Sequence, residues 1–371
     1  MTAKLTVMQV LPELEVGGVE HGTLEIAGAL VAAGHRAIVV SGGGRLVEKL
    51  QACGAEHVEL AVGAKRLSSL AHIHALAHIY QTFNVDIVHA RSRLPAWLAW
   101  LARRRLAVQQ RPAWVTTVHG PYTVNRYSRI MVSGEVVIAI SEFIRDYIRN
   151  SYPGYADARI ELIPRGVDAD HFQHGYQPPS PWRDAWHAQY PELAGKILLT
   201  FPGRLTRWKG QLDFIALLAG LRHRGLNVHG LVVGAAHPRK PHFANELKRA
   251  AASAGVEGAI TFLGNRTDLR EIFAISALAF SLATAPEAFG RTTLEALSIG
   301  TPVIGYDHGG TGEILATLFP AGRVAVGDVS AAIERSVALL GSEPHVPANA
   351  HYTVAVMQQR TLAVYAGLKR G

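Results

Sequence analysis

The sequence is poor in cysteine, in charge and in long apolar runs, and each shortage excludes a class of protein. A single cysteine, Cys53, among 371 residues excludes an internal disulfide and a cluster of cysteine metal ligands. Charged residues make up 18 %, against roughly 25 % in an average globular domain, whereas 49 % of the residues are hydrophobic. This balance excludes intrinsic disorder and indicates extensive buried surface. No run approaches the ~18 consecutive apolar residues that a membrane-spanning helix requires.

The N-terminal segment also lacks the basic head, apolar run and small-residue cleavage site of a signal peptide. We therefore expect a cytoplasmic protein, consistent with the single cysteine. At roughly 100–200 residues per domain, the length predicts two domains, each large enough to bury its own core.

Positive charge is concentrated in one part of the chain. The chain carries 37 Lys and Arg against 29 Asp and Glu, a formal net charge of +8. Residues 60–134 carry +9, with Asp86 as their one acid, and the remaining residues carry −1. Such a region favours nucleic acid, an anionic membrane surface or an anionic substrate as partner. Its cations are Lys65, Arg66, Arg91, Arg93, Arg103, Arg104, Arg105, Arg111, Arg126 and Arg129.

Short runs rich in Val and Ile alternate with longer amphipathic stretches along the chain. Because the runs are apolar on both faces and helices separate them, they predict parallel sheets covered on both sides. Two such arrays predict an α/β protein of two Rossmann-like, doubly wound domains that face a cleft. The expected strands are 5–10, 37–41, 86–89, 115–118, 136–140, 159–163, 197–202, 228–234, 259–263, 278–282 and 302–306. The expected helices are 19–33, 68–83, 141–150, 210–224, 242–254, 268–274, 292–299, 329–340 and 350–368.

Residues 173–195 interrupt this alternation. The run Pro178-Pro-Ser-Pro181 among them holds three prolines, and the segment shows no apolar periodicity. We place the interdomain connection here, which gives predicted domains at 1–180 and 190–349 and a last segment at 350–371.

A loop at the start of the second half carries two cations. Ligands of doubly wound sheets bind beyond the carboxyl ends of the strands, where Arg204 follows one strand and Lys209 precedes the next helix. An Arg fork and a Lys point charge can together bind a diphosphate. A solvated basic turn is the alternative.

A second loop of the same half combines carboxylates with a glycine. Glu287 precedes an expected helix, and Glu295 lies about one turn inside it. Gly290 permits close backbone approach, so its amide and those of Arg291 and Thr292 can point at an anion. The carboxylates there could accept hydrogen bonds from sugar and ribose hydroxyls, or be first-turn acids that the helix dipole favours.

Two features of the first half lie at the same kind of position. Gly17-Gly18 follows the first strand and permits close contact with a ligand, but it does not form the G-x-G-x-x-G dinucleotide motif. His119 closes a strand at its cleft-facing end, where a structural or a functional role is open.

Together these motifs resemble the retaining glycosyltransferases of family 4, which have the GT-B fold. The most specific part is the Glu287-x7-Glu295 spacing with the upstream Arg204 and Lys209. The resemblance runs over nearly the whole chain, and the stretch from His119 to Ile140 is similar to bacterial lipopolysaccharide core glycosyltransferases. Further matching segments are Gly17-Gly18, Ala139–Phe143, Ile163–Asp168, Phe289-Gly290 and Thr301–Ile314.

The resemblance implies roles for these residues in binding a nucleotide-diphosphate sugar. Arg204 and Lys209 would bind the donor diphosphate, and Gly17 and Gly18 would make room for its phosphates. Glu287 would lie by the donor sugar near its reacting carbon.

The resemblance also places residues around the rest of the donor. His119 would lie close to the donor sugar from the first domain, and Glu295 would hold the nucleotide ribose. Gly264, Asn265 and Arg266 would border the base. The final helix would cross back onto the first domain.

The chain departs from the family at two places. Arg165 stands where many relatives carry Asn, and we interpret this change as harmless because it lies in a loop. Ser281-Leu282 stands where relatives carry Pro-Ser, which leaves the geometry of the loop before Glu287 open.

We expect neither a metal nor a cofactor. Cleavage of the donor leaves negative charge on the phosphate, which Arg204, Lys209 and the helix amides can stabilise in place of a metal ion. Asp168-Ala-Asp170 resembles a metal-binding D-x-D, but its position in the family's loop favours a solvated or capping role. His74 and His78 lie one helical turn apart, without the Glu of H-E-x-x-H.

The resemblance also implies that residues 60–134, the basic window, would lie on the acceptor side, because the first domain of the GT-B fold receives the acceptor. Trp97 and Trp100 lie on an expected helix that ends in Arg103-Arg104-Arg105. This helix either lies at a membrane, with its arginines on the headgroups, or packs its aromatics on the sheet. Arg126 and Arg129 are better placed to meet an anionic acceptor.

We therefore expect a hexosyltransferase that moves a sugar from a nucleotide-sugar to a lipid-linked or lipopolysaccharide-core glycan. It would be cytoplasmic, with peripheral contact to the inner face of the membrane as an open alternative. A rival enzyme is a GT-B-fold nucleotide-sugar epimerase or hydrolase, which would form no new glycosidic bond. A rival from another class is a basic nucleic-acid-binding protein, but the sequence holds no such binding motif and we expect no nucleic-acid partner.

Overall fold

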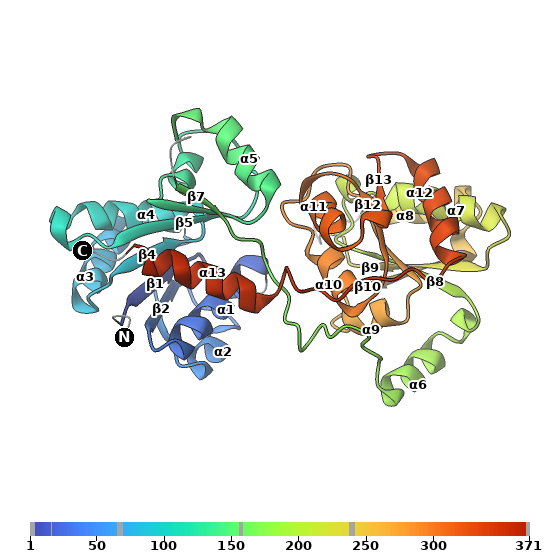
Figure 1. The fold of residues 1–371 in the computed structure, drawn as a ribbon, viewed down its shortest axis with the longest axis horizontal. Helices are drawn as coiled ribbons and strands as arrows, with labels where there is room; N and C mark the ends of the chain where they lie inside the picture. Colours follow the sequence, from blue (N-terminus) through green and yellow to red (C-terminus); the bar gives the residue numbers. More distant parts are fainter. Residues whose placement is uncertain (1–3, 16, 65–69, 156–158, 237–241, 369–371) are drawn as a thin grey trace. The chain divides into compact units, whose positions relative to one another are not determined.

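The computed structural model describes residues 4–15, 17–64, 70–155, 159–236 and 242–368. The chain forms two compact units, each built on a parallel sheet (Figure 1). Unit 1 holds residues 1–166 and 354–371, and unit 2 holds residues 167–353. The carboxyl ends of the strands in each sheet carry the loops in which the candidate residues lie.

Unit 1 contains a seven-stranded sheet in the order β3-β2-β1-β4-β5-β6-β7. Its strands are β1 (Thr6–Val10), β2 (Arg36–Ser41), β3 (Glu56–Glu59), β4 (Ile87–Ala90), β5 (Ala113–Val118), β6 (Val136–Ala139) and β7 (Arg159–Leu162). Its helices are α1 (Gly18–Ala32), α2 (Val47–Ala52), α3 (Ala71–Thr82), α4 (Arg93–Arg104), α5 (Glu142–Ser151) and α13 (Val354–Ala366).

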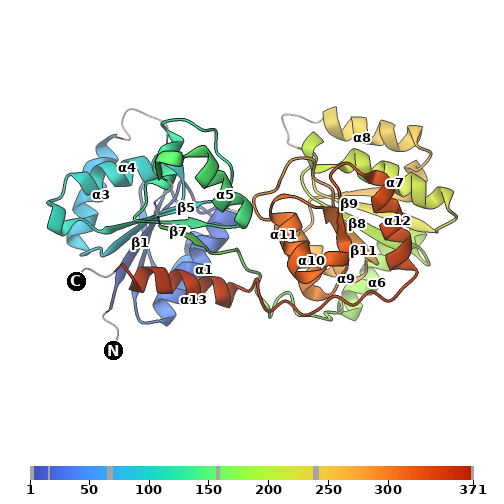
Figure 2. The same ribbon diagram turned by 45° about the horizontal axis from the view of Figure 1, so that its top comes forward.

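Helices cover both faces of this sheet, which is why its central strands are apolar on both sides. Every residue of β4, β5 and β6 is buried. Ile26 and Leu30 of α1 share one core with Met357, Val364 and Tyr365 of α13. Figure 2 shows α1 and α13 side by side on one face and α3 and α4 on the other.

Unit 2 contains a six-stranded sheet in the order β10-β9-β8-β11-β12-β13. Its strands are β8 (Ile197–Pro202), β9 (Val228–Val233), β10 (Ile260–Gly264), β11 (Leu278–Ser281), β12 (Val303–Tyr306) and β13 (Arg323–Val324). Its helices are α6 (Ser180–Gln189), α7 (Gln211–His223), α8 (His242–Ser253), α9 (Leu269–Ala274), α10 (Arg291–Ile299), α11 (Gly309–Leu318) and α12 (Val329–Leu340).

The connection expected at residues 173–195 belongs to unit 2, and the chain passes between the units at Gly166–Val167 and Thr353–Val354. The prolines stand before α6 or in its first turn, where a missing amide costs no hydrogen bond. Trp182 and Trp186 stack with their ring centroids 5.2 Å apart, and Trp186 packs in the core of unit 2. This four-residue aromatic spacing, which continues to Tyr190, is the helical signal that the prolines obscured.

Candidate functional site

The first loop of the unit 2 site joins β8 to α7. Arg204 is exposed just beyond the end of β8, and Lys209 closes the short 3-10 turn Arg207–Lys209. Gly210 then takes a left-handed conformation, with φ 87°. A Cβ atom here would lie 1.8 Å from the backbone oxygen of Leu282. Only glycine therefore lets this loop approach the end of β11 so closely.

A salt bridge joins this loop to the loop before α10. The Lys209 Nζ lies 2.9 Å from the Glu287 Oε1, and each side chain is about one-seventh exposed, at 15 % and 14 %. The amide of Thr284 also donates to the carbonyl oxygen of Trp208 at 2.7 Å. Because β8 and β11 are neighbours in the sheet, two residues distant in sequence meet at its carboxyl edge.

The segment that opens α11 supports the Glu287 loop from behind. The amide of Gly310 donates to the carbonyl oxygen of Glu287 at 2.8 Å. The ring Nε2 of His308 lies 2.7 Å from the carbonyl oxygen of Ala283. These contacts fix the backbone on both sides of the turn, so Glu287 is presented by a supported loop.

The N-terminus of α10 can bind an anion. Gly290 is its N-cap in a left-handed conformation, with φ 89°, and none of the described side chains caps the helix there. The first amides of the helix, at Arg291 and Thr292, therefore lack helical acceptors and carry the positive end of the helix dipole. A phosphate is the ligand that such an end favours.

Glu295 lies inside the same helix and is only 9 % exposed. Burial raises the pKa of Glu295, while the nearby Arg291 and His171 oppose this shift. The Arg291 Nε donates to the Glu295 Oε1 at 2.8 Å. Both predicted residues are thus engaged with each other, one turn apart on α10.

The residues expected at the nucleotide base have different environments. Arg266 donates two hydrogen bonds, of 2.8 and 2.6 Å, to the carboxylate of Asp268. That carboxylate also accepts from the indole Nε1 of Trp182. The carbonyl of Gly264 accepts from the amide of Gly234, whereas Asn265 is exposed. Of these three residues, Asn265 therefore has the side chain that is free to contact a ligand.

In unit 1, Gly17 and Gly18 open α1. No described side chain caps this helix at Gly17. A Cβ atom on Gly18 would meet no other atom within 4 Å. The pair therefore presents open backbone at a helix N-terminus, although Gly17 itself lies against the carboxylate of Glu20.

His119 is held by Arg165, the residue that we interpreted as a harmless departure. The Arg165 Nη2 lies 3.1 Å from the His119 Nδ1, and because a guanidinium can only donate, Nδ1 accepts and Nε2 carries the proton. The buried Nε2 has no partner among the described residues. Burial, then Arg165 and Arg91, hold the pKa of His119 well below its usual range, so the ring is neutral. The approach of His119 to a donor sugar stays a prediction.

Two buried polar residues lie beside His119: His89, to which sequence reasoning gave no role, and Arg91, which it counted only in the charge of residues 60–134. His89 is 1 % exposed, and its ring nitrogens lie 2.6 Å from the hydroxyls of Tyr365 and Thr117. Arg91 is 3 % exposed and donates to the Gln9 Oε1 at 2.6 Å. The signal that could have found them is a polar His-Ala-Arg run at the carboxyl end of an apolar strand.

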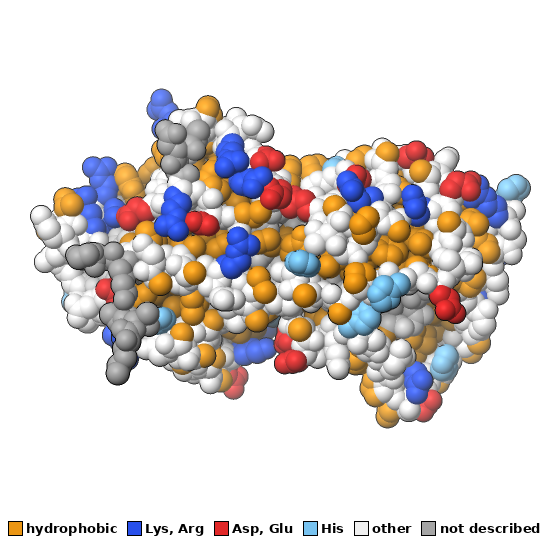
Figure 3. All heavy atoms as spheres, viewed as in Figure 1, with side chains coloured by type: hydrophobic (Ala, Val, Ile, Leu, Met, Phe, Trp, Pro, Cys, Tyr) orange, Lys and Arg blue, Asp and Glu red, His pale blue; other side chains and the backbone are white. Residues whose placement is uncertain are grey.

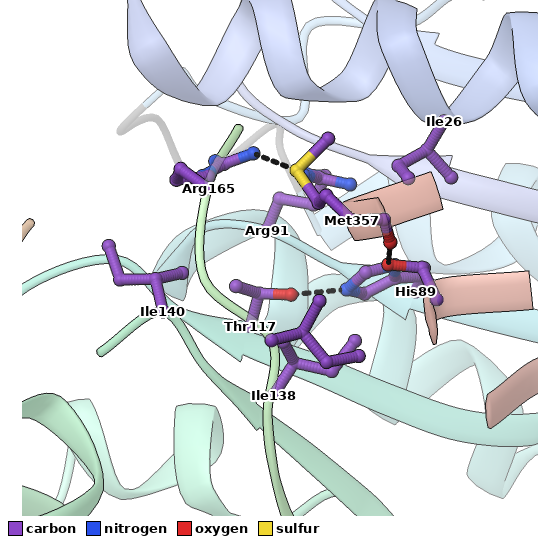
Figure 4. A pocket seen from close by; sticks show the side chains of 10 residues that line it. Ile26, His89, Arg91, Thr117, Ile138, Ile140, Arg165 and Met357 are labelled. Atoms are coloured by element: carbon purple, nitrogen blue, oxygen red, sulfur yellow. Dashed lines mark hydrogen bonds between the residues drawn. The ribbon is translucent and has the colours of Figure 1, made fainter. Parts of the chain in front are cut away.

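A small cavity at the carboxyl edge of the unit 1 sheet is lined by His89, Arg91 and Arg165. Figure 4 shows Arg91, Arg165 and Met357 at one end of it and His89 and Thr117 at the other. Its volume is about 10 Å³, the size of roughly one water molecule. The cavity therefore gives the polar cluster no room for a substrate.

The arginines at the end of α4 differ from one another. Arg103 donates to Glu135 and to the carbonyl oxygen of Pro112, both at 2.6 Å, so it serves as a structural tie. Arg104 stacks on Trp100, and Arg105 lies 2.8 Å from a ring nitrogen of His74. The buried face of α4 is formed instead by smaller side chains, namely Pro95, Ala96, Leu98, Ala99 and Ala102. Lys65 and Arg66 of the basic window lie outside the described residues.

Two further observations concern metals and membranes. Within the described part of the chain, the structure contains no group of three or more His, Cys, Asp or Glu placed to hold a metal ion. Asp168 accepts from the amides of Asp170 and His171, as a turn-capping residue does. Among the described helices, none is both long and apolar enough to cross a membrane.

The two doubly wound units and the cationic and acidic loops at one sheet edge define the class of GT-B-fold glycosyltransferases. The family model "Glycosyltransferase Family 4" matches residues 16–171, and "Glycosyl transferases group 1" matches residues 183–352. The two models together span most of the chain, which is a glycosyltransferase of the family 4 and group 1 type.

Characterised relatives are similar over part of their length. The chain is 29 % identical over 199 residues to a lipopolysaccharide core biosynthesis mannosyltransferase of Rhizobium meliloti, which covers 52 % of this chain and 54 % of that protein. It is 28 % identical over 245 residues to a D-inositol 3-phosphate glycosyltransferase of Mycobacterium tuberculosis, with coverages of 61 % and 48 %. The chain thus spans about half the length of these relatives.

Solved structures match the whole chain. A glycosyltransferase from Rickettsia africae is 28 % identical with a TM-score of 0.84, and the match covers 98 % of both chains. Anabaena HepE in complex with UDP-glucose is 19 % identical with a TM-score of 0.75, over 98 % of this chain and 100 % of that one. The likeness to HepE shows the fold alone.

Proposed function

We propose that this chain is a retaining, metal-independent hexosyltransferase that moves a sugar from a nucleotide-diphosphate sugar to a lipid-linked glycan such as lipopolysaccharide core. The observation that carries the proposal is the salt bridge between Lys209 and Glu287, which joins two loops at the edge of one sheet. The Anabaena neighbour is described with UDP-glucose, which supports a nucleotide-sugar donor.

The charges of the site fit the departure of a nucleoside diphosphate. When the bond between sugar and diphosphate breaks, negative charge grows on the leaving phosphate and positive character grows on the sugar carbon. Arg204, Lys209 and the amides at the start of α10 are the groups of unit 2 that stabilise the leaving phosphate. Glu287, whose carboxylate is already oriented by Lys209, accepts hydrogen bonds from hydroxyls of the donor sugar. Membership of a family of retaining enzymes supports retention at the sugar carbon.

The acceptor side of the proposal rests on unit 1 and on the relatives. The relatives are named for lipopolysaccharide core biosynthesis and for D-inositol 3-phosphate, and both names support a glycan or polyol acceptor. The second name also supports an acceptor that carries a phosphate. The basic window of residues 60–134 lies in unit 1 and suits an acceptor that carries negative charge.

A donor screen with two variants and one matched control tests the proposal. UDP-, GDP- and ADP-sugars are compared by thermal stabilisation, and the product formed with the best donor is analysed by NMR for its anomeric configuration. We expect Lys209→Ala and Glu287→Gln to lower kcat by roughly 10²–10³-fold while the protein stays folded. Arg207→Ala removes a neighbouring cation that pairs with Glu246 at the surface, and it should leave kcat unchanged.

Other results would overturn parts of the proposal. Full activity of either Lys209→Ala or Glu287→Gln would refute the site, and free sugar or isomerised donor as the product would favour a hydrolase or an epimerase. Loss of transfer in EDTA that is reversed by added metal would refute the metal-independent mechanism.

A further inference from the structure

Unit 1 contains a second cavity, which combines aromatic walls with arginines and shares no lining residue with the small cavity at His89. Trp97 and Trp100 of α4 line it together with Tyr155, Arg126 and Arg129. Its volume is about 270 Å³, just below the roughly 300–1,000 Å³ of pockets for drug-sized ligands. The two tryptophans therefore neither fill the core under the sheet nor project freely from the helix.

The aromatic walls are held in place by contacts outside the cavity. The indole rings of Trp97 and Trp100 meet nearly at right angles, at 86°, with centroids 5.7 Å apart. The Trp97 Nε1 donates to the carbonyl oxygen of Tyr127 at 2.8 Å, and the guanidinium of Arg104 lies 4.8 Å from the Trp100 ring. Two fixed indoles offer flat apolar faces that lose little entropy when a ligand binds.

The cations at this cavity are available to a ligand. Arg126 and Arg129 are both exposed, and neither guanidinium has a hydrogen-bond or ion-pair partner among the residues that the structure describes. Arg103 of α4, by contrast, is not available in this way, because Glu135 neutralises its charge. Two unneutralised guanidiniums at the rim of an aromatic cavity attract an anionic group and can bind it bidentately.

We propose that this cavity binds one phosphorylated sugar unit of the acceptor glycan. The apolar C–H face of a pyranose packs flat on an indole, and a phosphate on the same sugar reaches Arg126 and Arg129. The volume suits a single sugar residue. This inference rests on the proposed function and names the acceptor chemistry that unit 1 selects.

A membrane surface is the competing occupant, and the geometry of the tryptophans favours the sugar. A tryptophan that anchors a protein in a bilayer projects its ring from the surface and keeps its N–H at the headgroups. Here the Trp97 N–H is bonded within the protein, and both rings line a concave wall.

Calorimetric titration of the full chain tests the proposal with defined probes. Glucose 6-phosphate is compared with glucose, inorganic phosphate and vesicles of phosphatidylglycerol with phosphatidylcholine. We expect glucose 6-phosphate to bind more tightly than glucose or phosphate alone. The double variant Arg126→Ser/Arg129→Ser should bind it at least tenfold more weakly, and Trp100→Leu should weaken glucose 6-phosphate but not phosphate. The matched control is Arg149→Ser, an exposed arginine on α5 outside the cavity, which should bind as the wild type does.

The inference would be overturned if the double variant bound glucose 6-phosphate as tightly as the wild type does. It would also be overturned if Arg149→Ser weakened this binding as much as the double variant does. A third contrary result is arginine-dependent binding to vesicles without binding of the sugar phosphate. Thermal stabilisation by nucleotide-sugars separates this inference from the proposed function. Donor stabilisation that persists in the double variant leaves the donor site standing, whereas its absence in the wild type contradicts the donor site itself.

Discussion

At the scale of single residues, Gly210 determines how closely two loops of unit 2 can approach. Its left-handed backbone is strained for any other residue, and its missing Cβ leaves room for the backbone of Leu282. The neighbouring Lys209 reaches Glu287 only because this approach is possible. A structural property of one glycine thus sets the geometry of a pair of charged residues.

We predict that Gly210→Ala destabilises the protein more than Gly225→Ala does. Both glycines have positive φ, at 87° and 81°, but a Cβ on Gly225 meets nothing within 4 Å. The left-handed strain alone costs roughly 1–2 kcal/mol, and the clash with a backbone oxygen should add about 2 kcal/mol or more at position 210. Urea unfolding of the two variants measures the difference, and equal losses would contradict the account.

At the same scale, the structure gives Arg165 a contact that its loop position did not indicate. We interpreted this departure from the family as harmless, and its guanidinium donates to His119. It also fills the space beside Gly22 on α1, where a Cβ atom would lie 1.7 Å from the Arg165 Nη1. The departure from the family is therefore accommodated by a glycine on another element.

At the scale of elements, α13 completes unit 1 although it follows unit 2 in the sequence. Met357, Val364 and Tyr365 enter the core that α1 forms with the sheet, and Gln358 donates to the carbonyl oxygen of Glu25 at 2.9 Å. The Tyr365 hydroxyl meets the ring of His89. The helix therefore seals a titratable residue beneath it.

We predict that acid weakens unit 1 because His89 cannot accept a proton in the folded state. Burial, then Arg91 and Arg165, hold the pKa of His89 well below its usual range. Below pH ~6.5 the unfolded chain takes up a proton that the folded chain excludes, so the free energy of unfolding falls as the pH falls.

The size of this effect is up to about 2 kcal/mol between pH 7 and pH 5. Urea unfolding at the two pH values measures it. His89→Gln keeps hydrogen-bonding groups but does not titrate, so its stability should depend less on pH, although His119 retains part of the slope. An unchanged slope in this variant would contradict the prediction.

The elements that sequence patterns missed carry little local signal, for two physical reasons. The start of α11 is glycine-rich, His308-Gly-Gly-Thr-Gly312, and glycine is a poor helix former. Packing against the Glu287 loop stabilises it instead. Similarly, α2, β3 and β13 are only two to six residues long, too short to show a period.

At the scale of the whole molecule, the excess charge lies on one unit. Figure 3 shows Lys and Arg side chains over the part of unit 1 that holds α4, β7 and α5, several beside acidic side chains. Arg145 pairs with Glu142 and Arg159 pairs with Glu161, so local acids neutralise part of this charge. The unneutralised remainder includes Arg126 and Arg129 at the aromatic cavity.

We predict that salt weakens use of the acceptor more than use of the donor. The donor residues Lys209 and Arg291 already face carboxylates, whereas Arg126 and Arg129 of unit 1 are exposed to ionic screening. Raising the salt from low to physiological strength should lower kcat/KM for an anionic acceptor roughly tenfold. The donor value should change far less, and steady-state kinetics at two salt concentrations measure both. Equal sensitivity would contradict this assignment of charge.

The sequence by itself determined the alternation of strands and helices, the two parallel sheets and the loops that carry the charged motifs. Such patterns depend on residues a few positions apart, which one sequence displays directly. The tertiary structure decided which loops meet. Lys209 reaches Glu287 because β8 lies beside β11. Arg165, which follows β7, reaches His119, which follows β5, although β6 lies between the two strands. The tryptophans of α4 line a cavity. These contacts follow from sheet order and packing, which join residues that no local pattern connects.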